Sequence, residues 1–195
     1  MSQILPHLGA ALVIASLLLS LIRRLTEPGP LHIAVFVIAF VACLVPLLEY
    51  SISHYARVLT GDLAITSLIW LGFISIKTLV DRQRVRTDVE LIMSVIILAA
   101  ALVLYPTALG FTPVDLYRLG FQPVVLGPIV FMLFAVSVWF SSWLPAIMLP
   151  TGFIAFYFGC LESDNLWDYL IDPVITIYAI TLVVIERRRL KQLLL

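Results

Sequence analysis

The chain has 195 residues, of which 62% are hydrophobic and 12% are charged, and its mean hydropathy is +1.10. Soluble domains are usually about 45–50% apolar and about 25% charged. A water-soluble fold of this length could not bury so much apolar surface, so the composition excludes a globular protein of the cytosol or the extracellular space. We therefore expect the lipid bilayer to be the solvent of this protein.

The cysteines and histidines give no sign of a metal or redox site. Cys43 and Cys160 lie in apolar runs without CxxC spacing, which leaves a disulfide framework or a zinc cluster unsupported and predicts buried free thiols. His7, His32 and His54 lie far apart in the sequence. We expect no metal and no cofactor.

The first apolar run, residues 4–22, differs from a signal peptide. A signal peptide carries positive charge before its apolar stretch, whereas here no charge precedes the run and Arg23 and Arg24 follow it. We expect this segment to be retained as a first membrane span with its N-terminus outside.

Six further apolar segments follow, each close to the roughly 20 residues that a membrane-spanning helix needs. They are residues 31–48, 63–80, 87 to about 106, 124–140, 143–161 and a last segment that starts near Leu166 and ends at 185. Asp62 is placed to cap the third span, and Thr87 and Glu90 have capping-box spacing at the fourth. The fifth and sixth segments are joined by two serines, so they either both span or form a re-entrant hairpin.

The basic residues decide the orientation, because cytoplasmic loops carry an excess of Lys and Arg. With the N-terminus outside, Arg57 and Arg118 are the two basic residues outside, and the other ten of the twelve lie inside. An even number of spans would instead place the basic cluster at 187–191 outside. The sequence therefore predicts an all-α, polytopic membrane helix bundle of about seven transmembrane helices, with the C-terminus cytoplasmic and residues 1–195 in a single integral membrane domain.

Three short interfacial helices are expected on the outer face. Residues 51–59 place apolar side chains on one helical face and polar ones on the other. Residues 112–120 begin with an N-cap threonine and a proline and end at Gly120. Residues 166–171 have apolar side chains four apart and interfacial aromatic residues.

The outer face also collects most groups that could bind or catalyse. Seven of the twelve acidic residues fall there, together with the two outer arginines and one histidine. From these we select a candidate outer-face polar site made of Glu49, His54, Arg57, Asp115, Arg118, Asp164, Asp168 and Asp172.

Asp168 and Asp172 are the most informative members of this site. If the seventh helix begins near Asp164, the three aspartates stack on one face at intervals of four residues. Neighbouring carboxylates would repel, which raises one pKa or recruits a cation or an arginine, with Arg57 or Arg118 as that partner. In the structural alternative, Asp172 is an N-cap followed by Pro173 at the first helical position, and the other two aspartates lie in water.

The remaining polar candidates also have two interpretations each. Glu49 either joins His54 as a ligand or proton acceptor or is the polar end of the second span. Asp115 and Arg118 either cap and pair within their own short helix or let Arg118 bind lipid phosphate. Lys77, the one cation inside an expected span, can snorkel to the inner surface beside Asp81.

No nucleotide-binding, zincin, serine-elbow or CxxC motif is present. The sequence therefore favours a non-catalytic subunit of a larger membrane or extracytoplasmic assembly, in a bacterial cytoplasmic (inner) membrane. Expected partners are the lipid bilayer, another membrane or extracytoplasmic protein and phospholipid headgroups, but no nucleic acid. The alternatives are a transporter or channel for a small solute or cation, and an intramembrane enzyme acting on lipid headgroups at the outer leaflet.

Overall fold

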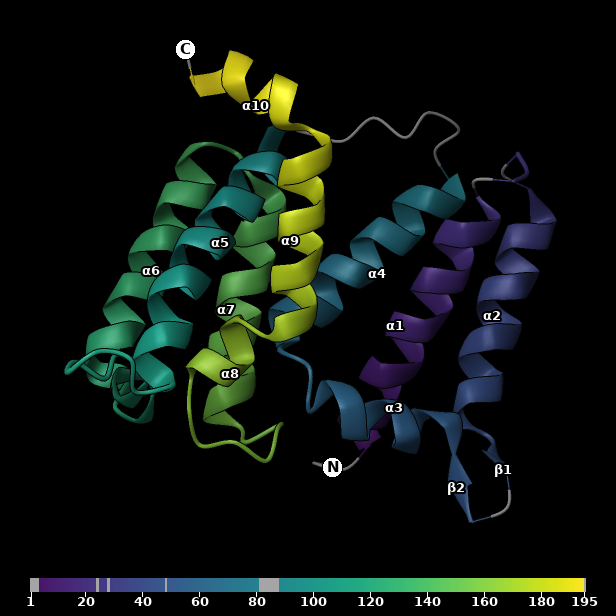
Figure 1. Ribbon diagram of the computed structural model, residues 1–195, viewed down its shortest axis with the longest axis horizontal. Coiled ribbons are helices and arrows are strands. Elements are labelled where there is room, and N and C mark those ends of the chain that lie inside the picture. Colours follow the sequence, from purple (N-terminus) through teal and green to yellow (C-terminus); the bar gives the residue numbers. More distant parts are fainter. Residues whose placement is uncertain (1–3, 24, 28, 48, 81–87, 195) are drawn as a thin grey trace. The chain divides into compact units, whose positions relative to one another are not determined.

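The computed structural model describes residues 4–23, 25–27, 29–47, 49–80 and 88–194. Its helices are α1 (Ile4–Ile22), α2 (Pro30–Leu44), α3 (Ile52–Thr60), α4 (Ile65–Val80), α5 (Asp88–Ala108), the 3-10 helix η1 (Tyr117–Phe121), α6 (Pro123–Trp139), α7 (Trp143–Tyr157), α8 (Trp167–Leu170), α9 (Pro173–Ile185) and α10 (Arg187–Leu194) (Figure 1). One antiparallel pair, β1 (Pro46–Leu47) with β2 (Tyr50–Ser51), joins α2 to α3. The expected all-α fold class is confirmed for the described residues.

Two helices in the described part of the chain, α1 and α5, are long and apolar enough to cross a membrane by length and composition. Five other helices are apolar but shorter, namely α2, α4, α6, α7 and α9. Their lengths range from 13 residues in α9 to 17 residues in α6. At about 1.5 Å of rise per residue, 17 residues extend about 25 Å, less than the roughly 30 Å hydrocarbon core of a bilayer. Helix length therefore supports two membrane spans. It does not by itself support the other five spans of the expected seven-span bundle.

The described residues form two compact units. The first comprises residues 1–63, 68–85 and 159–162, and the second comprises 64–67, 86–158 and 163–195, so that the first turn of α4 belongs to the second unit. Each unit is described here by itself.

In the first unit, α1 and α2 lie side by side and α3 crosses at their ends (Figure 1). Small residues make the surface of α1 easy to approach: Gly9, Ala11 and Ala15 are all buried. A Cβ atom at Gly9 would lie 2.9 Å from the Leu68 side chain. Further along α1, the Ser16 and Ser75 hydroxyls are 2.8 Å apart and link this helix to α4.

In the second unit, α5 packs on α9 and α6 packs on α7, while α8 lies against α7. Gly152 allows the last contact, because a Cβ atom there would lie 3.1 Å from the Leu170 side chain. The Tyr105 and Thr176 hydroxyls, 3.2 Å apart, connect α5 to α9.

The buried core is mainly hydrophobic, as in most proteins, but it also contains small polar side chains, and many large apolar side chains lie at the surface of the described residues. Small polar side chains such as Ser67, Ser94 and Asn165 are fully buried, while large apolar ones such as Leu102 and Phe131 are exposed. Water-soluble proteins of this size do not expose contiguous apolar surface on most of their helices.

The expected helix boundaries need four corrections. The second segment ends at Leu44 instead of 48, because Pro46 lacks an amide donor and the chain enters β1. The seventh is broken into α8 and α9, since Pro173 disfavours helical geometry in the residue before it. The expected helix over 112–120 is replaced by η1, which contains Gly120 instead of ending at it.

The fourth correction concerns the cap of the third segment. The Asp62 carboxylate binds Arg57, and the backbone amide just before α4 is capped by Asp172 instead. Thr87, expected in a capping box, and Asp81, expected beside the snorkelling Lys77, lie outside the described residues. Both cysteines are free thiols, Cys43 buried and Cys160 partly exposed.

Candidate functional site

The eight residues of the predicted outer-face site are distributed over both units. Glu49, His54 and Arg57 belong to the first unit, and the other five belong to the second. Within each unit, the structure brings some of them into polar clusters with residues that the sequence analysis did not select.

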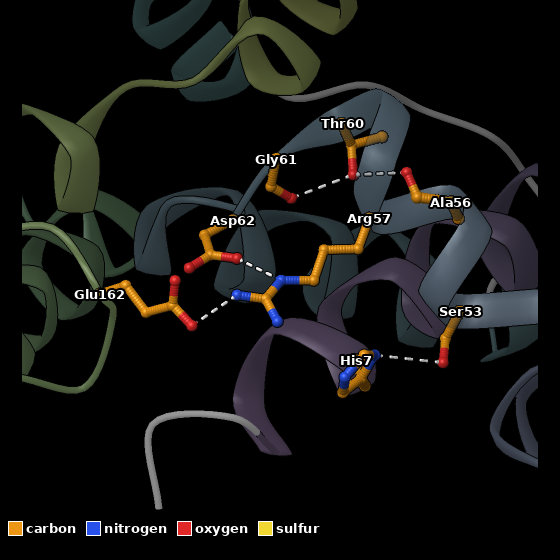
Figure 2. Close-up of polar contacts among 8 residues, drawn as sticks. All are labelled: His7, Ser53, Ala56, Arg57, Thr60, Gly61, Asp62 and Glu162. Atoms are coloured by element: carbon orange, nitrogen blue, oxygen red, sulfur yellow. Dashed lines mark hydrogen bonds and ion pairs between the residues drawn. The ribbon is translucent and has the colours of Figure 1, made fainter. Parts of the chain in front are cut away.

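The first cluster, the Arg57 cluster, consists of Arg57, Asp62 and Glu162 (Figure 2). Arg57 Nε donates to Asp62 Oδ1 at 2.7 Å, and Arg57 Nη2 donates to Glu162 Oε1 at 2.9 Å. Both hydrogen bonds raise the pKa of the Arg57 guanidinium, and the bond to Asp62 has the larger effect. The expectation that Arg57 pairs with Asp168 or Asp172 is wrong, because its two partners are Asp62 and Glu162.

Local geometry explains why Asp62 reaches Arg57. Helix α3 ends at Gly61, whose φ of +68° is readily adopted by glycine and rarely by other residues. This turn brings the next residue back along the last turn of α3. The Gly61 amide donates to the Arg57 carbonyl, so the same turn also caps the helix.

A second cluster joins α3 to the N-terminal part of α1. The His7 and His54 rings lie with their centroids 4.0 Å apart. The Ser51 hydroxyl is 2.8 Å from His54 Nδ1 and 2.7 Å from the Ser53 hydroxyl, which is 3.5 Å from His7 Nδ1. Both serines are buried, so the network attaches the polar face of α3 to α1.

His7 was not among the predicted site residues, since 46 positions separate it from Ser53 and no local spacing links the two. Two histidines do not complete a metal site. Within the residues that the structure describes, no group of three or more His, Cys, Asp or Glu side chains could hold a metal ion.

A third cluster lies in the second unit around Asp168. Its Oδ2 atom accepts hydrogen bonds from the Tyr117 hydroxyl at 2.8 Å and from the Ser163 hydroxyl. Burial first, and then the hydrogen bond to Asp168, raise the pKa of Tyr117 to about 12. The phenol is therefore a donor at neutral pH, and its hydrogen bond attaches α8 to η1.

Backbone contacts reinforce this attachment. Asn165 Nδ2 donates to the Tyr117 carbonyl at 3.0 Å, and Trp167 Nε1 donates to the Leu116 carbonyl at 3.1 Å. A Cβ atom at Gly120 would overlap the side-chain amide of Asn165. Glycine at this position therefore permits the close approach.

Asp172 has both carboxylate oxygens occupied. It is 4% exposed; its Oδ1 accepts from the Ile175 amide at 2.7 Å, and its Oδ2 accepts from the Ala64 amide at 2.8 Å. Asp172 therefore caps α9 and also binds the residue that precedes α4. Of the two interpretations of Asp172 given by the sequence, this geometry matches the one in which Asp172 is an N-cap followed by Pro173. The expected stack of three aspartates on one helix is wrong because Ile171 and Asp172 are extended.

The remaining predicted residues lie at the surface. Glu49 is exposed in the turn between β1 and β2, and Asp164 is exposed before α8. Asp115 and Arg118 are also exposed, and Asp115 Oδ1 accepts from the Arg118 amide at 3.2 Å, a local contact across the start of η1. In α4, the Lys77 ammonium lies 6.0 Å from the centre of the Phe73 ring.

No family model, no curated protein and no solved structure matches the chain. What the site does must therefore be argued from its geometry. In the described residues, the guanidinium of Arg57 and the carboxylates of Asp168 and Asp172 bind other parts of the chain, where they hold helix ends and loops together.

We predict that Asp172→Ala lowers the free energy of unfolding by about 2–4 kcal/mol, which combines a lost N-cap with a second buried amide left without an acceptor. Chemical denaturation in detergent would measure the change. Asp164→Ala removes an exposed aspartate nearby and should stay within about 0.5 kcal/mol of the wild type. Equal stability of Asp172→Ala and the wild type would refute the capping role.

The Arg57 cluster predicts two unequal ion pairs. The side chains of Arg57 and Asp62 are 23% and 20% exposed, whereas that of Glu162 is 58% exposed and better screened by water. Double-mutant cycles with Arg57→Ala should give a coupling of about 1 kcal/mol with Asp62→Ala and about 0.3 kcal/mol with Glu162→Ala. The reverse order would contradict this assignment.

The pKa of Tyr117 predicts a loss of stability at high pH. The pKa of Tyr117 is about 12 in the folded state, whereas the pKa of an unfolded tyrosine is about 10. The protonated Tyr117 hydroxyl therefore stabilises the folded state fully below about pH 10, and this contribution is lost as the pH rises toward about 12. The difference in thermal midpoint between the wild type and Tyr117→Phe should shrink over this interval, and a constant difference would argue against the assignment.

Proposed function

We propose that the protein is an integral membrane protein with about seven spans, its N-terminus outside and its C-terminus in the cytoplasm. The buried serines and the exposed leucines and phenylalanines support this proposal, because apolar exteriors suit a lipid solvent. The ten basic residues on the proposed inner side support the orientation. Shorter helices such as α9 can be accommodated by local thinning of the bilayer.

Its proposed role is that of a non-catalytic subunit, located in a bacterial cytoplasmic (inner) membrane, that binds another membrane or extracytoplasmic protein. The observation that carries this role is the exposed apolar face of α3. Val58 and Leu59 are 84% and 88% exposed, and Ile52 and Tyr55 are exposed beside them. We call these four residues the α3 face.

The polar face of α3 is already used within the chain, by the Ser53 and His54 network and by the Arg57 cluster. What α3 offers to a partner is therefore apolar and aromatic surface. Exposed patches of this kind mark sites of protein or membrane interaction. The engaged carboxylates favour this role over catalysis, since a general base needs an accessible acceptor atom.

The test is co-purification of the full chain from native membranes. We expect Val58→Glu and Leu59→Glu to lose the partner protein while they keep the size-exclusion profile of the wild type. Val114→Glu is the matched control, because it adds the same charge at an exposed apolar position outside α3 and should retain the partner.

Other outcomes would replace the proposal. Solute uptake by liposomes that contain the purified chain alone would indicate a transporter. Conversion of an added lipid by the purified chain, abolished by a carboxylate substitution that leaves the protein folded, would indicate an enzyme.

A further inference from the structure

We propose that the junction of α9 and α10 binds the phosphate group of an anionic membrane lipid. This inference rests on the proposed membrane location and adds a lipid-binding site on the C-terminal side of the chain. It is carried by a hollow at the junction, by the charges around it and by the apolar residues next to them.

The hollow has a volume of about 930 Å³ and is lined by residues at the end of α9 and the start of α10. Figure 1 shows where the chain passes from α9 into α10. Three arginines and one glutamate are the charged residues of its lining, which consists of Val184, Ile185, Glu186, Arg187, Arg188, Arg189 and Gln192. The lining is therefore net positive. Anions are the ligands that such a surface attracts.

The three arginines differ in their contacts and in their exposure. Arg189 Nη2 binds Asp88 Oδ1 at 2.6 Å and so fixes the first turn of α10 to the start of α5. Arg187 and Arg188 are exposed. A guanidinium can donate two parallel hydrogen bonds to one phosphate, which gives both charge and geometry suited to this group.

Apolar residues in the same lining favour a lipid over free phosphate as the ligand. Val184 and Ile185 are 62% and 56% exposed at the end of α9, an otherwise apolar helix. A phospholipid could place its phosphate on the arginines and its acyl chains along these residues. Basic residues directly after a membrane helix are a general feature of anionic-lipid binding.

The test uses native mass spectrometry of the full chain in detergent, titrated separately with phosphatidylglycerol, phosphatidylcholine and inorganic phosphate. We expect retained phosphatidylglycerol and little retention of the other two ligands. Arg187→Gln combined with Arg188→Gln should weaken phosphatidylglycerol binding at least about tenfold.

The matched control combines Arg118→Gln with Lys191→Gln, which removes two positive charges outside the lining and should bind like the wild type. Unchanged binding by the arginine double variant would overturn the site, and so would equal retention of phosphatidylcholine. Inorganic phosphate that displaces the lipid from the wild type would show an ion site and would also overturn it. A chain recovered without detergent from the soluble fraction would instead overturn the membrane location, so the two failures are distinguishable.

Discussion

The second unit depends on one buried carboxylate, that of Asp172, which provides acceptors for backbone amides at the starts of two helices. Because these amides are buried, they cannot rely on water, and each one left without a partner is costly. Asp172 serves two of them, Ile175 in its own helix and Ala64 far away in the sequence. One buried carboxylate therefore sets both the start of α9 and its attachment to the segment that enters α4.

Backbone carbonyl groups near helix ends in the second unit have the complementary need for donors, and side chains provide them. Where α8 stops and α9 has not yet begun, the Leu170 carbonyl accepts a hydrogen bond from the Thr66 hydroxyl at 2.6 Å. Beside it, Asn165 and Trp167 provide donors for carbonyl groups near η1. Polar side chains are thus concentrated where helices break, and the helix surfaces between them remain apolar.

Much of the helical pattern could be predicted from the sequence, because it follows from apolar run length and from local signals. Residues 4–22 are α1 without any change, and the short helix over 51–59 is found as α3 within one residue. The break at Ile171 was partly readable, since an aspartate before Pro173 is a local N-cap signal.

The partners of the polar side chains were not predictable in the same way. Arg57 was expected to meet an aspartate of the last helix, but Glu162, 105 positions away, occupies one side of its guanidinium. Such pairings depend on how the segments pack, and hydrophobic periodicity says little about that packing. Tyr117 and Asp168, 51 positions apart, show the same limit. In contrast, the local contact of Asp115 was predictable because its acceptor and donor lie three residues apart.

The bond between Ala64 and Asp172 has a consequence for the time course of biosynthesis. Its two ends are 108 residues apart, which at about 5–20 residues per second corresponds to roughly 5–20 s of translation. During that interval the early segment exists without the carboxylate that later binds it. The second unit, which contains both residues, therefore cannot complete this contact beside α4 until the last apolar segment has left the ribosome, and this closing step belongs to the end of synthesis.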